Sequence, residues 1–276
     1  MLNINKELIK EVILISEKAG SAILDIYDKS DIEINIKDDK SPLTQADIAS
    51  HNIIVKRLNQ LTPKIPILSE ESSKVDFSVR SKWSNYWLID PLDGTKEFLK
   101  KNGEFTVNIA LIQNNTPVLG VIFVPVRNQY FWGSKEFGSF YSSDGNKVEK
   151  LKVSEGSWNS LRIVTSRSHI NEELEALLKE MDSFDLVSIG SSLKFCLIAA
   201  GKADIYPRFG LTSEWDTAAG EAIVRFAGGY ITNIDGNQMT YNSKESLINS
   251  HFVVSCNKEI CQKFLNLSKK KISSGV

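Results

Sequence analysis

The hydrophobic positions near the N-terminus repeat with the spacing of a helix. Between residues 6 and 28 they recur at every third or fourth position, at Ile9, Val12, Ile15, Ala19, Ala22, Ile23 and Ile26. This spacing predicts one amphipathic helix. The pattern then changes, because Ile32, Ile34 and Ile36 alternate with polar residues and predict a strand.

A second helix follows soon after. Ser41-Pro42 predicts a turn, and Thr44-Gln45-Ala46-Asp47 has the form of a capping box. We expect the helix that this box opens to continue to about Leu61. Hydrophobic residues predict strands over 86–89, 106–112 and 118–124, with 113–117 joining the last two. Phe131-Trp132 and Phe140-Tyr141 suggest further strands, and Asp144-Gly145 a hairpin turn, so the first half is mixed α and β with antiparallel character.

The second half alternates more regularly between the two periods. Strands are predicted over 161–165, 186–189 and 203–206, and helices over 171–181, 191–200 and 216–227. Such alternation is typical of a layered α/β arrangement. We therefore divide the chain into an N-terminal α+β part, 1–153, and a C-terminal α/β part, 154–276. The polar tail from Lys269 is expected to fray.

Composition narrows the classes of function. The chain has 276 residues with a formal net charge of −1 and a pI of about 6.4, so it has no global basic field for long nucleic acids or anionic membranes. Its three cysteines include no CxxC pair, which argues against a disulfide framework, and Cys196 lies in an apolar run that predicts a buried thiol. We find no signal-peptide pattern and no membrane-spanning run, and expect a cytoplasmic protein. Peripheral association with the cytoplasmic side of the inner membrane and the oligomeric state stay open.

The candidate chemistry is carried by acidic residues at the ends of predicted elements. In the run 87–95, an apolar strand ends in Asp90-Pro91-Leu92-Asp93, and Gly94-Thr95 then opens a helix. Glu70-Glu71 ends a short apolar run upstream, and Trp215-Asp216 begins a helix downstream. Taken singly, these acids are ordinary helix caps or solvated loop ends. Together they predict one site that gathers hard cations.

The donor types favour Mg²⁺, with Mn²⁺ as the alternative. Glu70, Asp90, Asp93 and Asp216 offer only oxygen, without thiol or imidazole. The turn between Asp90 and Asp93 would leave the carbonyl of Leu92 unpaired as a further ligand. Two metals about 3.5–4 Å apart could clamp the attacking and leaving oxygens of a phosphate ester. The backbone N–H groups after Gly94 would form a cradle for that phosphate.

This ordered set resembles the inositol monophosphatase superfamily of metal-dependent, lithium-sensitive phosphatases. The resemblance rests on the motifs at 69–72, 87–95 and 215–220, and it covers nearly the whole chain. It implies a layered αβαβα sandwich and two or three Mg²⁺ ions. It also implies metal ligands at Glu70, Asp90, the Leu92 carbonyl, Asp93 and Asp216. The water-activating pair of the family falls on Thr95 and Asp47, whereas the alternative role of Asp47 is a helix cap.

A closer resemblance concerns the substrate. Segments 93–98, 102–108, 166–169, 190–197 and 204–209 resemble the bacterial 3'(2'),5'-bisphosphate nucleotidase branch. That branch removes the 3'-phosphate of 3'-phosphoadenosine 5'-phosphate (PAP), a by-product of sulfate activation. The resemblance implies that the substrate is bound by Glu70, Leu92, Asp93, Gly94, Thr95, His169, Ser191, Ser192, Lys194, Arg208 and Asp216.

Within that set, Arg208 and Lys194 are expected to hold the second phosphate, and His169 to pack against adenine. The alternatives are a surface ion pair for Arg208 and a plain loop residue for His169. Two other functions remain open at this point. One is an inositol monophosphate or sugar bisphosphate phosphatase of the same mechanism, and the other is a catalytically silent nucleotide-binding regulator.

Overall fold

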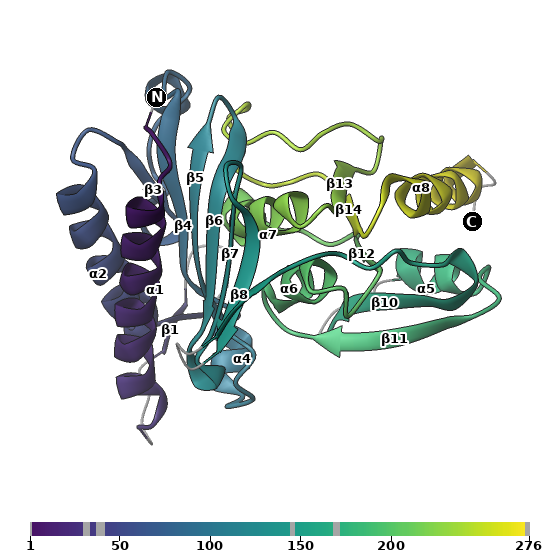
Figure 1. The fold of residues 1–276 in the computed structure, drawn as a ribbon, viewed down its shortest axis with the longest axis horizontal. Coiled ribbons are helices and arrows are strands. Elements are labelled where there is room, and N and C mark those ends of the chain that lie inside the picture. The colour runs from purple at the N-terminus through teal and green to yellow at the C-terminus, as the bar shows by residue number, and fades with distance from the viewer. Residues whose placement is uncertain (1, 30–33, 37–41, 144–146, 168–171, 274–276) are drawn as a thin grey trace.

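Figure 1 shows a computed structural model of the chain, which describes residues 2–29, 34–36, 42–143, 147–167 and 172–273. Its secondary structure forms five layers in the order helices, sheet, helices, sheet, helices (Figure 1). The expected αβαβα sandwich is therefore confirmed. A continuous hydrophobic core fills the space between the two sheets, with residues such as Leu88 from the first half and Val254 from the second.

The first layer consists of the helices α1 (Lys6–Tyr27) and α2 (Gln45–Leu61), which pack on each other and cover the first sheet. Asn5 caps α1 by accepting a hydrogen bond from the Leu8 N–H at 2.8 Å. The short strands β1 (Ile34–Ile36) and β2 (Pro42–Thr44) pair antiparallel between the helices. The predicted turn at Ser41-Pro42 is wrong for Pro42, which begins β2, a strand position that proline tolerates. Ser41 lies outside the described residues.

The second layer is a seven-stranded sheet in the order β3-β4-β5-β6-β7-β8-β9. Its strands are β3 (Ile67–Ser69), β4 (Asn85–Asp93), β5 (Thr106–Gln113), β6 (Thr116–Val124), β7 (Gln129–Ser134), β8 (Gly138–Ser143) and β9 (Lys147–Lys150). All pairs are antiparallel except β3 with β4. The loop between β5 and β6 is shorter than expected, because Asn114 and Asn115 both adopt positive φ and close a two-residue turn. The predicted Asp144-Gly145 turn lies outside the described residues.

Short helical segments lie between the strands of the N-terminal half. They are the 3₁₀ turns η1 (Glu70–Ser72) and η2 (Pro125–Arg127) and the α-helices α3 (Phe77–Arg80) and α4 (Thr95–Leu99). A third 3₁₀ turn, η3 (Trp158–Ser160), leads into the second sheet. The division of the chain at residue 153 falls between the two sheets, and it stays a prediction.

The middle layer holds α6 (Leu193–Ala199) and α7 (Glu214–Phe226). Helix α7 lies directly on the first sheet. A Cβ atom at Gly120 of β6 would come within 2.3 Å of the Ala219 carbonyl oxygen, so the helix backbone touches the strand backbone. This close contact holds the N-terminal turn of α7, which carries Asp216, near the end of β4.

The second sheet has the order β11-β10-β12-β14-β13. Its strands are β10 (Leu161–Ser166), β11 (Phe184–Ile189), β12 (Ile205–Arg208), β13 (Tyr230–Asn233) and β14 (Phe252–Ser255). Strands β10, β11 and β12 are parallel, whereas β14 pairs antiparallel with β12 and β13. Strand β12 starts and ends two residues later than expected, because its pairing with β14 continues past the last apolar residue to Arg208.

The outer helices α5 (Glu172–Leu178) and α8 (Lys258–Ser273) complete the fold (Figure 1). The prediction of a frayed tail from Lys269 is wrong, since α8 continues to Ser273. Its buried side chains Ile260, Phe264 and Leu265 anchor it on the second sheet. The buried thiol predicted at Cys196 is confirmed. Among the described residues, no helix is both long enough and apolar enough to cross a membrane.

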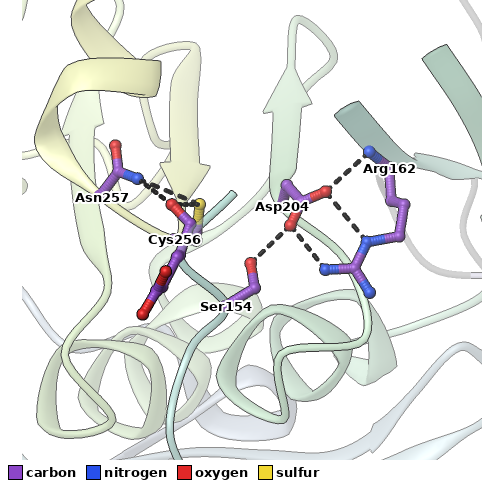
Figure 2. Close-up of polar contacts among 6 residues, drawn as sticks. Ser154, Arg162, Asp204, Cys256 and Asn257 are labelled. Atoms are coloured by element: carbon purple, nitrogen blue, oxygen red, sulfur yellow. Dashed lines mark hydrogen bonds and ion pairs between the residues drawn. The ribbon is translucent and has the colours of Figure 1, made fainter. Parts of the chain in front are cut away.

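A buried carboxylate ties the connection between the sheets to the second sheet (Figure 2). Asp204 accepts hydrogen bonds from Ser154 Oγ at 2.5 Å and from the backbone N–H of Arg162 at 2.8 Å. It also accepts two from the Arg162 guanidinium, at 3.0 and 2.7 Å. Burial would raise the pKa of Asp204, but these hydrogen bonds outweigh it and lower the pKa.

We expect Asp204→Asn to destabilise the fold by about 1.5–3 kcal/mol, the contribution of a hydrogen bond to a charged group. Since the folded-state pKa is lowered, this stability is present above the unfolded pKa of about 3.9 and is lost as pH falls below it. Urea unfolding should therefore show a constant gap between variant and wild type from pH 8 to 5 and a smaller gap below pH 4. A gap that stays constant down to pH 3.5 would contradict this account.

Candidate active site

The strand β4 ends in an irregular segment that frees the predicted metal-binding atoms. In its pairing with β5, Asp90 lies opposite Asn108 and Asp93 opposite Thr106, and the two residues between the aspartates fall outside the register. Leu92 therefore has a carbonyl outside the ladder. Ser50 of α2 fixes the segment by donating to the Pro91 carbonyl at 2.7 Å.

Four carboxylates from three elements approach one another at this end of the sheet. Glu70 begins η1 directly after β3, which runs parallel to β4, and Asp216 lies in the first turn of α7. Burial, followed by the charges of Glu70, Asp93 and Asp216, raises the pKa of Asp90 well above its usual range. Burial, followed by Asp93 and Glu70, does the same to the pKa of Asp216. The structure thus brings together the four acids that the sequence singled out.

Such a cluster fits a hard cation. Its donors are oxygen atoms only, and their mutual repulsion is relieved by positive charge. Hydrogen bonds engage some of these oxygens, since Asp90 Oδ1 accepts from the Leu92 N–H at 3.1 Å and others reach Oδ2 of Asp93 and Oδ2 of Asp216. Within the described residues, no group of three or more histidine, cysteine, aspartate or glutamate side chains is already arranged to hold a metal ion. The fit therefore rests on the donor chemistry and the crowded charge.

Asp47 serves as a helix cap and also contacts Thr95. Its Oδ2 accepts from the N–H of Thr44 at 2.8 Å and from the hydroxyl of Thr44 at 2.6 Å, which completes the predicted capping box. Its Oδ1 lies 3.3 Å from Thr95 Oγ1, and the Leu92 carbonyl lies 3.4 Å from that hydroxyl. Capping and orientation of Thr95 therefore use different oxygens and are compatible.

Gly94 makes the turn between Asp93 and Thr95. Its φ of 92° lies in the left-handed region, and a Cβ there would lie 3.1 Å from both the Glu104 carbonyl oxygen and Ser191 Cβ. The left-handed backbone and this close packing against Glu104 and Ser191 both favour glycine at position 94, which also lines the cavity described below. Helix α4 has only five residues and a small dipole, so the proposed phosphate cradle rests mainly on the place of Gly94 in the cavity lining.

A cavity of about 150 Å³ joins the carboxylates to the second half of the chain. Its lining includes the predicted residues Asp93, Gly94, Ser191, Ser192, Lys194, Arg208 and Asp216. Burial, together with the nearby Arg208, lowers the pKa of Lys194 to about 8, although Asp93 opposes this shift. The Lys194 ammonium donates to the Ser191 carbonyl at 2.5 Å. The cavity lining therefore combines acidic groups with cationic groups, among them Lys194 and Arg208.

Arg208 lies at the end of β12 and faces this cavity. Its Nη2 donates to the Leu211 carbonyl at 3.0 Å, but its buried Nε has no hydrogen-bond partner. The described residues place no carboxylate within ion-pair distance of Arg208, so they do not support the alternative of a surface ion pair. A buried donor without a partner is costly, and an anion in the cavity would relieve that cost. His169 lies outside the described residues.

Sequence reasoning missed two residues that organise the site from β5. Asn108 Nδ2 lies 2.9 Å from Ser192 Oγ and 3.3 Å from Asp93 Oδ2, and Thr106 Oγ1 lies 2.9 Å from Asn108 Oδ1. Ser192 Oγ is in turn 2.7 Å from Asp93 Oδ2. The Ser192 hydroxyl is thus engaged with a proposed metal ligand. The register between β4 and β5 creates these contacts, and the sequence carries no separate signal for them.

Comparison with known proteins shows which family the chain resembles. The family model described as "Inositol monophosphatase family" matches residues 4–271. The 3'(2'),5'-bisphosphate nucleotidase CysQ of Salmonella typhimurium is 44% identical over 90% of this chain and 99% of its own length. The CysQ of Escherichia coli K12 is 43% identical with the same coverage.

Solved structures agree with the sequence comparison. The crystal structure of CysQ from Bacteroides thetaiotaomicron, described as a bacterial member of the inositol monophosphatase family, matches with a TM-score of 0.80 and 41% identity, covering 92% of this chain and 98% of that one. The extragenic suppressor protein suhB of Bartonella henselae matches with a TM-score of 0.81 and 26% identity, over 98% and 100% of the two chains. The chain belongs to the inositol monophosphatase family.

Proposed function

We propose that this protein is a Mg²⁺-dependent 3'(2'),5'-bisphosphate nucleotidase that hydrolyses the 3'-phosphate of PAP to give AMP and phosphate. The observation that carries the proposal is the charge of the cavity lining, which combines carboxylates with Lys194 and Arg208. A substrate with two phosphates would use both kinds of group, one through bound cations and the other directly. Relatives that are more than 40% identical over nearly their whole length bear the nucleotidase name. In a cell, the reaction would clear a by-product of sulfate activation from the cytoplasm.

The two phosphates would be held by different chemistry. The reacting 3'-phosphate would lie at the carboxylates, where Gly94 lines the cavity. The 5'-phosphate, which does not react, would accept hydrogen bonds from Arg208 and from Lys194. A pKa of about 8 leaves Lys194 mostly protonated at pH 7, and a bound phosphate would favour that charged form further.

Catalysis would consist of positioning and activating one water molecule. The ions that Glu70, Asp90, Asp93, Asp216 and the Leu92 carbonyl would hold, two or three in our proposal, supply positive charge that neutralises the phosphate. The Thr95 hydroxyl would hydrogen-bond to the water and orient it. Thr95 Oγ1 lies 3.3 Å from Asp47 Oδ1. Asp47 would then receive the proton, or orient the hydroxyl, since threonine alone is a weak base.

A substrate panel tests this function. Purified protein would be assayed for phosphate release from PAP, inositol 1-phosphate and fructose 1,6-bisphosphate, each with Mg²⁺ and with EDTA. We expect PAP to have the highest kcat/KM and EDTA to abolish turnover. A preference for either sugar substrate would favour the alternative phosphatase function, whereas PAP binding without turnover would indicate a silent regulator.

The role of Arg208 gives a prediction about selectivity. Arg208→Ala should lower kcat/KM for PAP about 10- to 150-fold, because a charge-assisted hydrogen bond contributes about 1.5–3 kcal/mol. Hydrolysis of 3'-AMP, which has no 5'-phosphate, should scarcely change, so the wild-type preference for PAP should narrow. Initial rates on both substrates measure this effect. Equal losses on PAP and 3'-AMP would assign Arg208 to the scissile phosphate or to the fold instead.

A further inference from the structure

The turn that precedes Lys194 has an unusual backbone. It connects β11 to α6 through Gly190, Ser191 and Ser192. Ser191 has a φ of 49°, in the left-handed region that residues with a Cβ atom seldom adopt. Such a conformation persists only where surrounding contacts hold it. The contacts around this turn therefore decide where its backbone and the side chains attached to it lie.

Glu104, just before β5, is the anchor of this turn. Its Oε2 accepts a hydrogen bond from the Gly190 N–H at 2.8 Å and another from Arg167 Nε at 2.9 Å. Its Oε1 accepts from Arg167 Nη2 at 2.7 Å, so the arginine binds both carboxylate oxygens. Burial alone would raise the pKa of Glu104, but the hydrogen bonds from Arg167 and Gly190 prevail and lower it. The carboxylate is thus held charged between the two halves of the chain.

The turn is linked to the Lys194 ammonium by the backbone and by one hydrogen bond. Gly190, whose N–H binds Glu104, is followed by Ser191, whose carbonyl accepts from Lys194 Nζ at 2.5 Å. The turn also packs closely, because a Cβ on Gly190 would lie 3.0 Å from the Glu104 carbonyl oxygen. Glu104 therefore contributes to the position of the ammonium through Gly190 and Ser191. Ser192, by contrast, is held separately by Asp93 and Asn108.

We infer that Glu104 and Arg167 form a positioning pair that sets the preference for bisphosphate over monophosphate substrates. They would do so without touching the substrate, by holding the 190–192 turn so that Lys194 meets the non-reacting phosphate. The inference rests on the proposed function of the site. It assigns the pair to substrate binding. The chemical step would depend on Asp47, Thr95 and the carboxylates proposed to hold the metal ions.

The test uses two variants that differ in their risk of misfolding. Glu104→Ala removes the anchor itself, whereas Arg167→Ala removes a side chain that is 47% exposed and leaves the Gly190 hydrogen bond in place. We expect Glu104→Ala to raise KM for PAP about 5- to 30-fold, with little change in kcat and little change on 3'-AMP. Arg167→Ala should show the same pattern with a smaller rise. Arg127→Ala is the matched control, because that guanidinium lies 3.9 Å from Glu104 and is not part of the bidentate pair.

A double-mutant cycle with Lys194→Ala separates positioning from general stability. If Glu104 acts through the ammonium, Glu104→Ala should have little further effect on KM for PAP once Lys194 is absent. Additive losses, equal losses on PAP and 3'-AMP, or a lower melting temperature with unchanged selectivity would each overturn the inference. The proposed function fails separately, if the wild type itself does not prefer PAP to 3'-AMP. If the wild type prefers PAP and Arg208→Ala narrows that preference while both pair variants leave it intact, the positioning role alone is wrong.

Discussion

Asp90→Asn and Asp93→Asn are each expected to lower turnover by several orders of magnitude while the fold survives. Each change keeps the shape of the side chain and removes one negative charge from a site that is proposed to bind Mg²⁺ through charged oxygens. Phosphate release from PAP in saturating Mg²⁺ measures the effect. The matched control is Asp235→Asn, the same change at an exposed position, which should leave turnover near that of the wild type.

Asp90→Asn should also stabilise the metal-free protein. Burial and three neighbouring carboxylates raise the pKa of Asp90, so its ionisation opposes folding as pH rises above the usual range of a carboxyl group. In EDTA at neutral pH, Asp90→Asn should therefore melt at the wild-type temperature or higher, and Mg²⁺ should stabilise the wild type more than the variant. Near-normal turnover of either variant, or equal stabilisation by Mg²⁺, would show that the metal assignment is wrong.

Thr95→Ala and Asp47→Asn should lower kcat about 10²- to 10⁴-fold, the range for loss of general acid–base assistance. Substrate affinity should change little, because both residues are proposed to act on the water and not on the ester. Thr95→Ser keeps the hydroxyl and should recover most of the activity. Steady-state kinetics on PAP gives both parameters.

Thr44→Ala distinguishes catalysis from helix capping. This change removes the hydroxyl that caps α2 and leaves the contact between Asp47 and Thr95 intact. It should cost about 0.5–2 kcal/mol of stability and leave kcat unchanged. An Asp47→Asn variant that behaves in the same way, with a lowered melting temperature and an unchanged kcat, would reduce Asp47 to a cap.

Local signals in the chain predicted the elements that carry the site. The helical periodicity of residues 6–28 and the capping box at Thr44 correspond to α1 and α2 within one or two residues. Errors arose where pairing with a distant strand sets an element's ends. Strand β12 reaches Arg208 because β14 extends it.

The sequence by itself determined which acids could bind a metal, since Glu70, Asp90, Asp93 and Asp216 stand at element ends within recognisable motifs. Their residue types, and the turns that place them, are local properties that a linear pattern records. Only the tertiary structure decided what these acids meet. Asn108 reaches Asp93 through the register of β4 with β5, and Glu104 meets Arg167 and Gly190 across more than 60 residues of chain. Such contacts depend on strand pairing and on how the two halves pack, and neither leaves a periodic trace in the sequence.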